Sequence, residues 1–163
     1  MNATLIVLRH GKAAPHDAYP TDHARPLVAR GHAEAEFIGR HLADHGPRPK
    51  VILTSPVLRA LTTAQVVARH LHMTPQTHDG LSTDVSWKRV LAMLTSQLPE
   101  QGTMLISGHN PTLSELLQEL LIPGATGSGD LHTGEAAILR FDEVVAQRSA
   151  TLIDRVRLAA EEH

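Results

Sequence analysis

Residues 5–11 read Leu-Ile-Val-Leu-Arg-His-Gly, a short apolar run that ends in two basic side chains and a glycine. The unbroken run of branched apolar residues predicts a buried strand over Leu5–Leu8. Two later stretches repeat the arrangement. A strand is predicted at Val51–Thr54, ahead of Ser-Pro-Val-Leu-Arg, and another at Met104–Ile106, ahead of Ser-Gly-His-Asn-Pro. Each of these strands is therefore followed by polar or basic groups.

Helical patterns separate the predicted strands. The spacing of apolar residues, with Pro or Gly at the ends of several segments, predicts helices over His32–His45, Pro56–Leu71, Trp87–Leu98 and Thr112–Leu121. Ser55-Pro56 and Asn110-Pro111 each have the form of a helix cap followed by proline at the first helical position.

The remaining segments are connections and one further strand. Lys12–Arg30 is predicted to be a long loop, and Thr74–Leu81 a connector that can hold a minor strand. A strand is predicted at Ala136–Phe141, after a glycine-rich segment, 124–134, that is expected to form a flexible loop beside the site. Ser149–Ala160 fits either a helix or an edge strand.

Strands that alternate with helices predict an α/β fold, here a three-layer sandwich with a mostly parallel central sheet and helices on both faces. The 163 residues, 42% of them apolar, fit one domain over residues 1–163. No apolar run approaches the ~20 residues of a membrane span, and no leader is evident. We therefore expect a cytoplasmic protein with no membrane association.

Composition excludes several classes of chemistry. The chain has 0 Cys, which rules out disulfides, a cysteine nucleophile and thiolate zinc sites. Its formal net charge of −2 argues against nucleic acid as a partner. Among the 12 His, His41 and His45 have helical i, i+4 spacing, but no third metal ligand is evident. We expect them to be solvated residues of a helix face.

The basic motifs should meet, because ligands of open α/β sheets bind beyond the carboxyl ends of the strands. Arg9, His10, Arg59 and His109 would gather there, beside two helix N-termini that favour an anion. Arginine forks match phosphate oxygens, and a neutral imidazole among cations is a competent nucleophile. The pattern predicts phosphoryl transfer through a phosphohistidine. The competing interpretation for each residue alone is a solvated cap.

At these residues the sequence resembles a known family. Leu8-Arg9-His10-Gly11 resembles the Arg-His-Gly signature of the histidine phosphatase superfamily, and residues 55–64 and 108–111 are similar to its second and third motifs. The short chain and the segment from Arg25-Pro26-Leu27 to Gly31 look like the small SixA-type phosphohistidine phosphatase branch. The resemblance runs from about Leu5 to Phe141 and implies a phosphoglycerate mutase-like fold.

The resemblance also implies a role for each residue. His10 would be the nucleophile, and Arg9, Arg59 and His109 would hold the phosphoryl oxygens. Gly11 and Asn110 are expected to complete the binding site. Lys12 is expected near the mouth of the site and Arg25 at its rim or in a structural role. We expect no metal and no other cofactor.

Larger superfamily members, such as phosphoglycerate mutases, carry a glutamate general acid between the second and third motifs. Here Asp84 is the candidate acid, although an exposed acid that interacts with a helix N-terminus explains it equally well. A labile P–N bond asks less of an acid than an alkoxide leaving group does. The expected substrate is therefore a phosphohistidine on a signalling protein, such as a histidine phosphotransfer domain.

Two alternatives remain open. One is a phosphomonoesterase that acts on a small phosphorylated molecule, and the other is a non-catalytic module that binds phosphorylated proteins. The protein is expected to be a monomer or a weak dimer.

Overall fold

The computed structural model describes residues 1–124, 127 and 129–160. In this part of the chain a six-stranded sheet forms the centre, with the strand order β3-β2-β4-β1-β5-β6. The strands are β1 Asn2–Arg9, β2 Val51–Thr54, β3 Gln76–Thr77, β4 Gln101–Gly108, β5 Ala136–Phe141 and β6 Ala150–Val156. Neighbours among β3, β2, β4 and β1 pair in parallel, whereas β5 pairs antiparallel to β1 and β6 antiparallel to β5.

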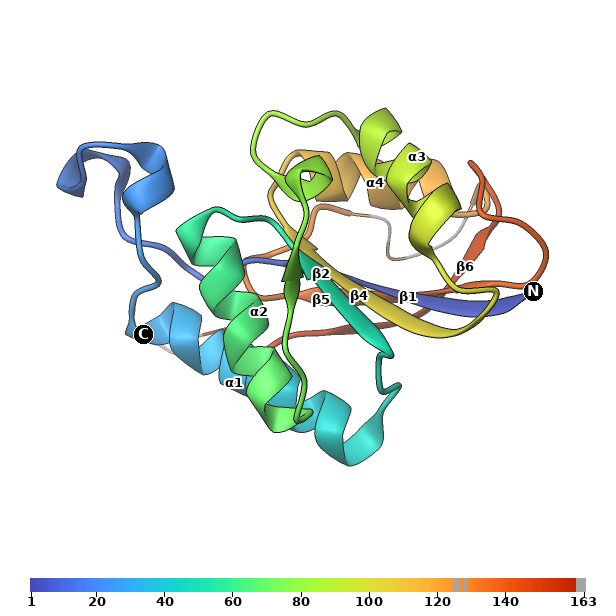
Figure 1. Cartoon of the computed structure of the whole chain (residues 1–163), viewed down its shortest axis with the longest axis horizontal. Coiled ribbons are helices and arrows are strands. Elements are labelled where there is room, and N and C mark those ends of the chain that lie inside the picture. Colours follow the sequence, from blue (N-terminus) through green and yellow to red (C-terminus); the bar gives the residue numbers. More distant parts are fainter. Residues whose placement is uncertain (125–126, 128, 161–163) are drawn as a thin grey trace.

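Helices cover both faces of this sheet (Figure 1). The α-helices of the described residues are α1 Ala29–His45, α2 Leu58–His70, α3 Trp87–Gln97 and α4 Thr112–Leu120. Short 3-10 helices occur at η1 His16–Ala18, η2 Asp22–Ala24 and η3 Asp79–Leu81. Helices α1 and α2 lie on one face and α3 and α4 on the other. The predicted three-layer α/β sandwich is confirmed.

Alternation along β1 divides the core in two. Leu5 and Val7 belong to the cluster that α3 and α4 cover. Ile6 and Leu8 belong to the cluster under α1 and α2. Because successive side chains of a strand point to opposite faces, one apolar run serves both layers. All four residues are 0% exposed, which explains why the run Leu5–Leu8 has no polar member.

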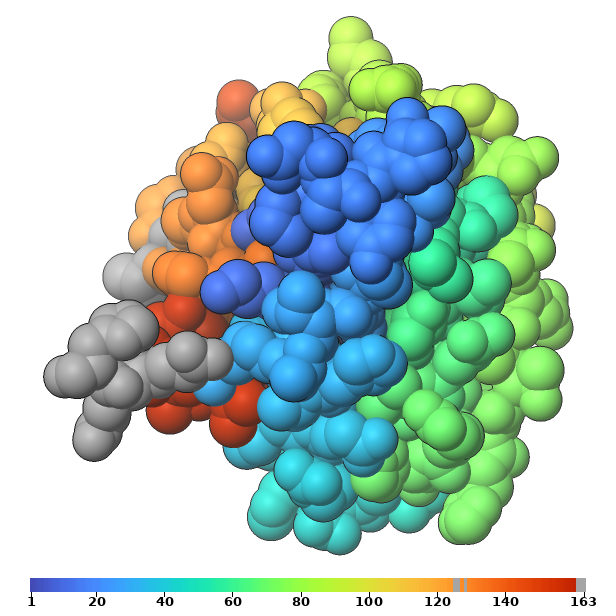
Figure 2. Space-filling model, turned by 90° about the vertical axis from the view of Figure 1, so that its left-hand side faces the viewer, coloured from blue at the N-terminus to red at the C-terminus, as the bar shows by residue number. Residues whose placement is uncertain are grey.

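The loop between β1 and α1 stands over one end of the sheet. Figure 2 shows residues 12–28, in blue, as a raised part of the surface beside residues 130–135, in orange. The second segment is joined to the end of β1 through the backbone, because Gly134 N–H donates to the carbonyls of Arg9, at 3.1 Å, and His10, at 2.9 Å. No helix in the described part of the chain is long and apolar enough to cross a lipid bilayer.

Elements β1, α1 and β4 each begin three residues earlier than predicted, at Asn2, Ala29 and Gln101. Two further features differ from the sequence prediction or decide between its alternatives. The tail forms β6, an antiparallel edge strand on β5, so the helical alternative for Ser149–Ala160 is wrong. Helix α2 begins at Leu58 rather than at Pro56. The reason is that Ser55 Oγ accepts a hydrogen bond from Val57 N–H at 3.1 Å, which forms a turn ahead of the helix. The glycine-rich segment lies partly outside the described residues.

Candidate active site

The strands that precede the basic motifs are neighbours in the sheet, in the order β2, β4, β1. They are parallel, so their carboxyl ends lie at one edge. Backbone hydrogen bonds continue past these ends. His10 N–H donates to Gly108 C=O at 3.1 Å, and Ser55 N–H donates to Ser107 C=O at 2.9 Å. The three segments that follow the strands are thereby held side by side.

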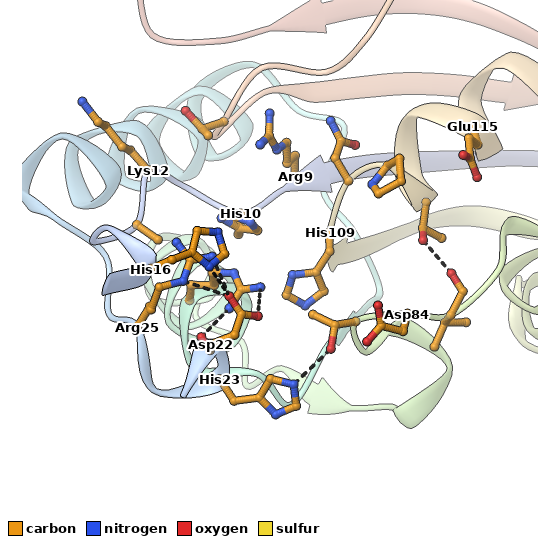
Figure 3. A pocket seen from close by; sticks show the side chains of 18 of the residues that line it. Arg9, His10, Lys12, His16, Asp22, His23, Arg25, Asp84, His109 and Glu115 are labelled. Atoms are coloured by element: carbon orange, nitrogen blue, oxygen red, sulfur yellow. Dashed lines mark hydrogen bonds and ion pairs between the residues drawn. The ribbon is translucent and has the colours of Figure 1, made fainter. Parts of the chain in front are cut away.

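A cavity of about 790 Å³ opens at this edge of the sheet. Arg9, His10, Arg59 and His109 all line it, so the structure brings together the four residues that the sequence singled out. Figure 3 shows His10 and His109 near the middle of the pocket, with Lys12 on one side and Glu115 on the opposite side. The two imidazole rings have centroids 5.4 Å apart.

The His10 side chain is held by the backbone that follows it. Its Nδ1 lies 2.7 Å from the carbonyl oxygen of Gly11. Because a carbonyl only accepts, Nδ1 carries the hydrogen and Nε2 keeps its lone pair. Burial lowers the pKa of His10 to about 4, and the nearby Arg59 and Arg9 act in the same direction, while the hydrogen bond to Gly11 opposes them. The ring is therefore neutral at pH 7.

The backbone after His10 packs against two helices. Gly11 N–H donates to Thr63 Oγ1 of α2 at 3.0 Å. A Cβ atom on Gly11 would lie 2.5 Å from the carbonyl oxygen of Gly31 in α1, so a side chain cannot be accommodated there. The Lys12 N–H donates to Glu34 Oε1 of α1 at 2.8 Å. These contacts fix the carbonyl that orients the His10 ring.

His109 is oriented by a hydroxyl at the end of β2. Its Nε2 lies 2.8 Å from Ser55 Oγ, and both residues are buried. The Ser55 oxygen already accepts from Val57 N–H, and its own hydrogen is available for His109 Nε2. This assignment leaves the hydrogen of the neutral ring on Nδ1. The pKa of His109 is lowered to about 3, mainly by burial, and the adjacent His10 and Arg59 act in the same direction.

Arg59 comes from the first turn of α2 and is 4% exposed. Its Nη1 donates to the backbone carbonyl of Asp22 at 2.9 Å, and its Nη2 donates to Asp22 Oδ2 at 2.9 Å. Arg25 Nε also donates to this carboxylate, at 3.0 Å. Partial burial raises the pKa of Asp22, but the hydrogen bonds from Arg59 and Arg25 outweigh burial and lower it. Asp22 is thus an ionised carboxylate that orients Arg59.

Arg9 is anchored on the other side of the pocket. Its Nη1 donates to the carbonyl oxygen of Leu131 at 3.0 Å. Burial lowers the pKa of Arg9, and the nearby Glu34 and Asp130 oppose that shift. A guanidinium stays protonated in proteins, so the site keeps this positive charge.

Three buried nitrogen atoms lack a hydrogen-bond partner among the side chains that the structure describes: Arg9 Nε, Arg59 Nε and His109 Nδ1. All three belong to residues that line the cavity. An unsatisfied buried donor costs about 1–3 kcal/mol, so each of these nitrogens calls for a partner from outside the chain. Two of the donors are cationic guanidinium groups, which suits an anion.

Comparison with known proteins identifies the family. The sequence profile of the histidine phosphatase superfamily (branch 1) matches residues 5–101. An uncharacterized protein of Picosynechococcus sp. is 34% identical over 125 residues, which cover 76% of this chain and 75% of that protein. The chain belongs to the histidine phosphatase superfamily.

Solved structures narrow the branch within the superfamily. A SixA-type protein of Agrobacterium tumefaciens is 29% identical, with a TM-score of 0.80 and coverage of 96% of this chain and 98% of that one. The protein histidine phosphatase SixA in complex with tungstate is 25% identical, with a TM-score of 0.79 and coverage of 94% and 96%. This histidine phosphatase is therefore a hydrolase of the SixA-type branch, with the phosphoglycerate mutase-like fold.

The other predicted site residues of this histidine phosphatase occupy different positions around the cavity. Asp84 lines it, is exposed and lies three residues before the first residue of α3, Trp87. Asn110 lines it as well, but both ends of its amide are engaged: Nδ2 donates to Leu131 C=O at 3.0 Å, and Oδ1 accepts from Ser114 Oγ at 2.8 Å. Lys12 and Arg25 both line the cavity too, as expected of residues at its mouth and rim.

His41 and His45 lie elsewhere. Their ring centroids are 5.0 Å apart, and they line a separate hollow formed with strands β5 and β6. Within the described residues, no group of three or more His, Cys, Asp or Glu side chains is arranged to hold a metal ion.

Sequence reasoning missed three participants of the site: Asp22, Ser55 and the Leu131 carbonyl. Asp22 lies in the long loop, where no periodicity marks a charge that folds back onto Arg59. Ser55 was identified, but as a helix cap rather than as the partner of His109. A backbone carbonyl has no signature in the side-chain sequence. The spacing of Asp22 and Arg25, three residues apart before a proline, is the one signal that could have suggested a local ion pair.

Proposed function

We propose that this phosphatase removes phosphoryl groups from phosphohistidine on a protein, through a covalent phosphohistidine intermediate on His10. The observation that carries the proposal is the set of three buried donors without partners, Arg9 Nε, Arg59 Nε and His109 Nδ1, around one cavity. His10 lines the same cavity and has a free Nε2 lone pair. Donors that can hold phosphoryl oxygens and a nucleophile that can attack phosphorus thus share one site.

In the first step, His10 Nε2 attacks the phosphorus in line with the leaving group. An N–P bond forms to His10, the bond from phosphorus to the leaving imidazole breaks, and that imidazole takes up a proton. The low pKa of His10, about 4, keeps its lone pair available at neutral pH. The hydrogen bond from Nδ1 to Gly11 C=O stabilises the positive charge that develops on the ring.

Arg9, Arg59 and His109 stabilise the charge on the transferring oxygens. Their unpaired donors lie in a buried site, where such hydrogen bonds are stronger than in water. His109 is suited to the role of a neutral donor, because Ser55 occupies its Nε2 and leaves the hydrogen on Nδ1. In the second step, the oxygen of a water molecule bonds to phosphorus, the bond from phosphorus to His10 Nε2 breaks, and the proton of the water passes to solvent. Inorganic phosphate leaves and the neutral ring is regenerated.

Two arguments favour phosphohistidine as the substrate: the chemistry of its leaving group and the solved structures that resemble this chain. Imidazole leaves phosphorus with less help from an acid than an alkoxide needs. Solved structures similar to this chain include a protein histidine phosphatase, SixA. The physiological partner would then be a phosphorylated signalling protein, such as a histidine phosphotransfer domain.

One observation favours a second candidate function. The carboxylates of Asp84 and Glu115 line the cavity, and Figure 3 places both on the His109 side of His10. If either protonates a leaving oxygen, the protein acts on a small phosphoester. Asp84, on the loop ahead of α3, is the candidate acid for that reaction.

The test compares kcat/KM for a phosphohistidine protein with kcat/KM for a panel of sugar phosphates and phosphoserine. We expect the phosphohistidine protein to be preferred. The Asp84→Asn variant should lower turnover of the phosphoesters more than turnover of phosphohistidine. His41→Ala, a histidine variant away from the cavity, serves as the matched control. A preference for a small phosphoester that Asp84→Asn abolishes would instead establish the second candidate.

A further inference from the structure

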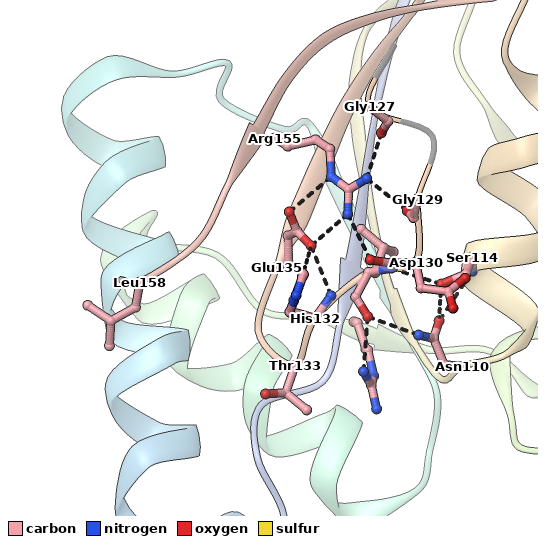
Figure 4. Close-up of polar contacts among 12 residues, drawn as sticks. Asn110, Ser114, Gly127, Gly129, Asp130, His132, Thr133, Glu135, Arg155 and Leu158 are labelled. Atoms are coloured by element: carbon pink, nitrogen blue, oxygen red, sulfur yellow. Dashed lines mark hydrogen bonds and ion pairs between the residues drawn. The ribbon is translucent and has the colours of Figure 1, made fainter. Parts of the chain in front are cut away.

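Arg155, on the edge strand β6, uses every hydrogen that its guanidinium can donate. Nε donates to Glu135 Oε2 at 2.9 Å, and Nη2 donates to Glu135 Oε1 at 2.7 Å and to the Asp130 carbonyl at 3.0 Å. Nη1 donates to the carbonyls of Gly127, at 2.6 Å, and Gly129, at 2.8 Å. A guanidinium has five N–H donors in a fixed planar fork, and here each has an acceptor. Figure 4 shows this arrangement.

Glu135, the residue just before β5, holds the Arg155 guanidinium in place. It is 5% exposed and also accepts from His132 N–H at 2.9 Å. Burial raises the pKa of Glu135, but the hydrogen bonds from Arg155 and His132 outweigh burial and lower it. Arg155 is thus held by a buried, ionised carboxylate, and its remaining donors all face the backbone carbonyls of Gly127, Gly129 and Asp130.

The fork controls the peptide unit between residues 130 and 131. Arg155 holds the Asp130 carbonyl of that unit, and Ser114 Oγ accepts from its N–H, on Leu131, at 3.0 Å. With both ends fixed, the peptide plane has one orientation. The next peptide unit is held as well: its N–H, on His132, donates to Glu135 Oε1 at 2.9 Å, the carboxylate that Arg155 binds. Its carbonyl, that of Leu131, accepts from Arg9 Nη1 and Asn110 Nδ2, each at 3.0 Å.

We propose that Arg155 is a positioning residue for phosphoryl binding: through the peptide of residues 130 and 131 and the Leu131 carbonyl, it orients the Arg9 guanidinium in the active site. The inference rests on the proposed role of Arg9 as a phosphoryl ligand. Arg155 lies beyond residues 5–101, which match the superfamily profile, so the C-terminal strand would contribute to a site whose first two motifs lie in the matched segment.

Charge alone cannot perform this role. The contacts require a planar fork with donors in fixed directions, which lysine lacks although it keeps the positive charge. Arg155→Lys is therefore the informative variant. Arg140→Lys is the matched control, because Arg140 lies on the adjacent strand β5 and pairs with Asp142 at the surface, with its side chain 44% exposed.

The first measurement is a double-mutant cycle on tungstate affinity, determined by calorimetry. Arg155→Lys should weaken tungstate binding by about tenfold, and Arg140→Lys should leave it unchanged. In an Arg9→Ala background, the further loss from Arg155→Lys should largely disappear, because Arg155 acts through Arg9. A loss of equal size in both backgrounds would overturn the inference while leaving the proposed function intact. An Arg9→Ala protein with wild-type affinity would contradict the proposed function, and the inference with it.

The second measurement reads Arg9 directly. Its Nε–H signal, assigned by its absence in Arg9→Ala, should be sharp in the wild-type ¹H–¹⁵N spectrum and broadened in Arg155→Lys. A signal that Arg155→Lys leaves unchanged would overturn the inference. Circular dichroism and melting curves show whether each variant folds. If Arg155→Lys does not fold, Glu135→Gln keeps the Arg155 side chain but removes one of its five contacts, because the amide NH2 cannot accept a hydrogen bond, and weakens a second. The same cycle applies, with a smaller expected loss.

Discussion

His10 and His109 lie side by side, with ring centroids 5.4 Å apart, yet their hydrogen-bond partners favour opposite tautomers. His10 donates from Nδ1 to a carbonyl, which leaves Nε2 free to attack. His109 is held at Nε2 by Ser55, which leaves Nδ1 as a donor. One ring therefore offers a lone pair and the other a hydrogen, although both are buried neutral imidazoles.

The depressed pKa values make stability depend on pH. The pKa of His10 is about 4 and that of His109 about 3 in the folded state, against about 6.5 in an unfolded chain. Below about pH 6.5 the unfolded state binds more protons than the folded state, so stability falls as the pH is lowered toward about 4. Between about pH 7.5 and about pH 5, each histidine should cost about 2 kcal/mol of the free energy of unfolding.

Urea denaturation at the two pH values measures this loss. The His109→Gln variant should show a smaller loss than the wild type, because one of the two titrating rings is gone. A His10 signal that titrates near its unperturbed pKa in an NMR pH series would contradict the account.

Ser55→Ala tests the tautomer of His109. The variant removes the hydroxyl that occupies Nε2, so the hydrogen can move there from Nδ1 and one donor to the phosphoryl group is lost. We expect kcat to fall roughly tenfold or more. The matched control is Ser107→Ala, which removes a buried hydroxyl that donates to the Ala60 carbonyl at 3.0 Å. Both variants should lose about 1 kcal/mol of stability. Equal kcat values in the two variants would show that Ser55 is only structural.

At the scale of elements, the start of α1 and the loop after β1 are built against each other. A Cβ atom on Gly31 would lie 2.1 Å from the Lys12 carbonyl oxygen. Helix propensity alone favours alanine over glycine by about 1 kcal/mol. The steric contact is with backbone atoms that cannot rotate away, so it outweighs propensity. Gly31→Ala should therefore destabilise the protein and displace the loop that carries the Gly11 carbonyl.

Activity should report that displacement. Gly31→Ala is expected to lower kcat by more than its loss of stability explains. Ile38→Val is the comparison: it lies in the core of the same helix and should cost about 0.5–1.5 kcal/mol without a change in kcat. A Gly31→Ala protein with wild-type stability and turnover would show that the loop relaxes freely.

The elements also show what a single sequence can predict. Short branched runs such as Leu5–Leu8 and Val51–Thr54 identify buried strands, because both faces of the strand are covered. The tail could not be assigned, since the partly exposed β6 lacks a clean period and its state depends on pairing with β5. The start of α2 was misplaced because the Ser55 side chain forms a turn and contacts His109, and only tertiary structure reveals that competition.

The candidate site also contains residues that the sequence predicts and others that only tertiary structure reveals. Arg9, His10, Arg59 and His109 were predictable because each directly follows a strand or opens a helix, and parallel topology gathers those positions. Asp22 and the Leu131 carbonyl were not, because they reach the site from loops. Loop geometry is fixed by contacts such as the Arg155 fork, which connect residues far apart in the chain.

For the molecule as a whole, the account predicts catalysis without a metal ion. Arg9 and Arg59 already bring positive charge to the proposed phosphoryl site. In other phosphatases a divalent ion supplies that charge and stabilises the phosphoryl oxygens. Turnover should survive dialysis against EDTA, with a metal-dependent phosphatase treated in parallel as the control for chelation. Loss of activity that returns only with an added divalent ion would contradict this prediction.

Rapid-quench labelling with a ³²P-phosphorylated substrate tests whether His10 carries the phosphoryl group. We expect an acid-labile, alkali-stable label on the wild-type protein, located at His10 by peptide mapping. The label should be absent from a folded His10→Ala variant that has lost turnover, and present in the His41→Ala control. A folded His10→Ala protein that still carries the label and still hydrolyses the substrate would contradict the account.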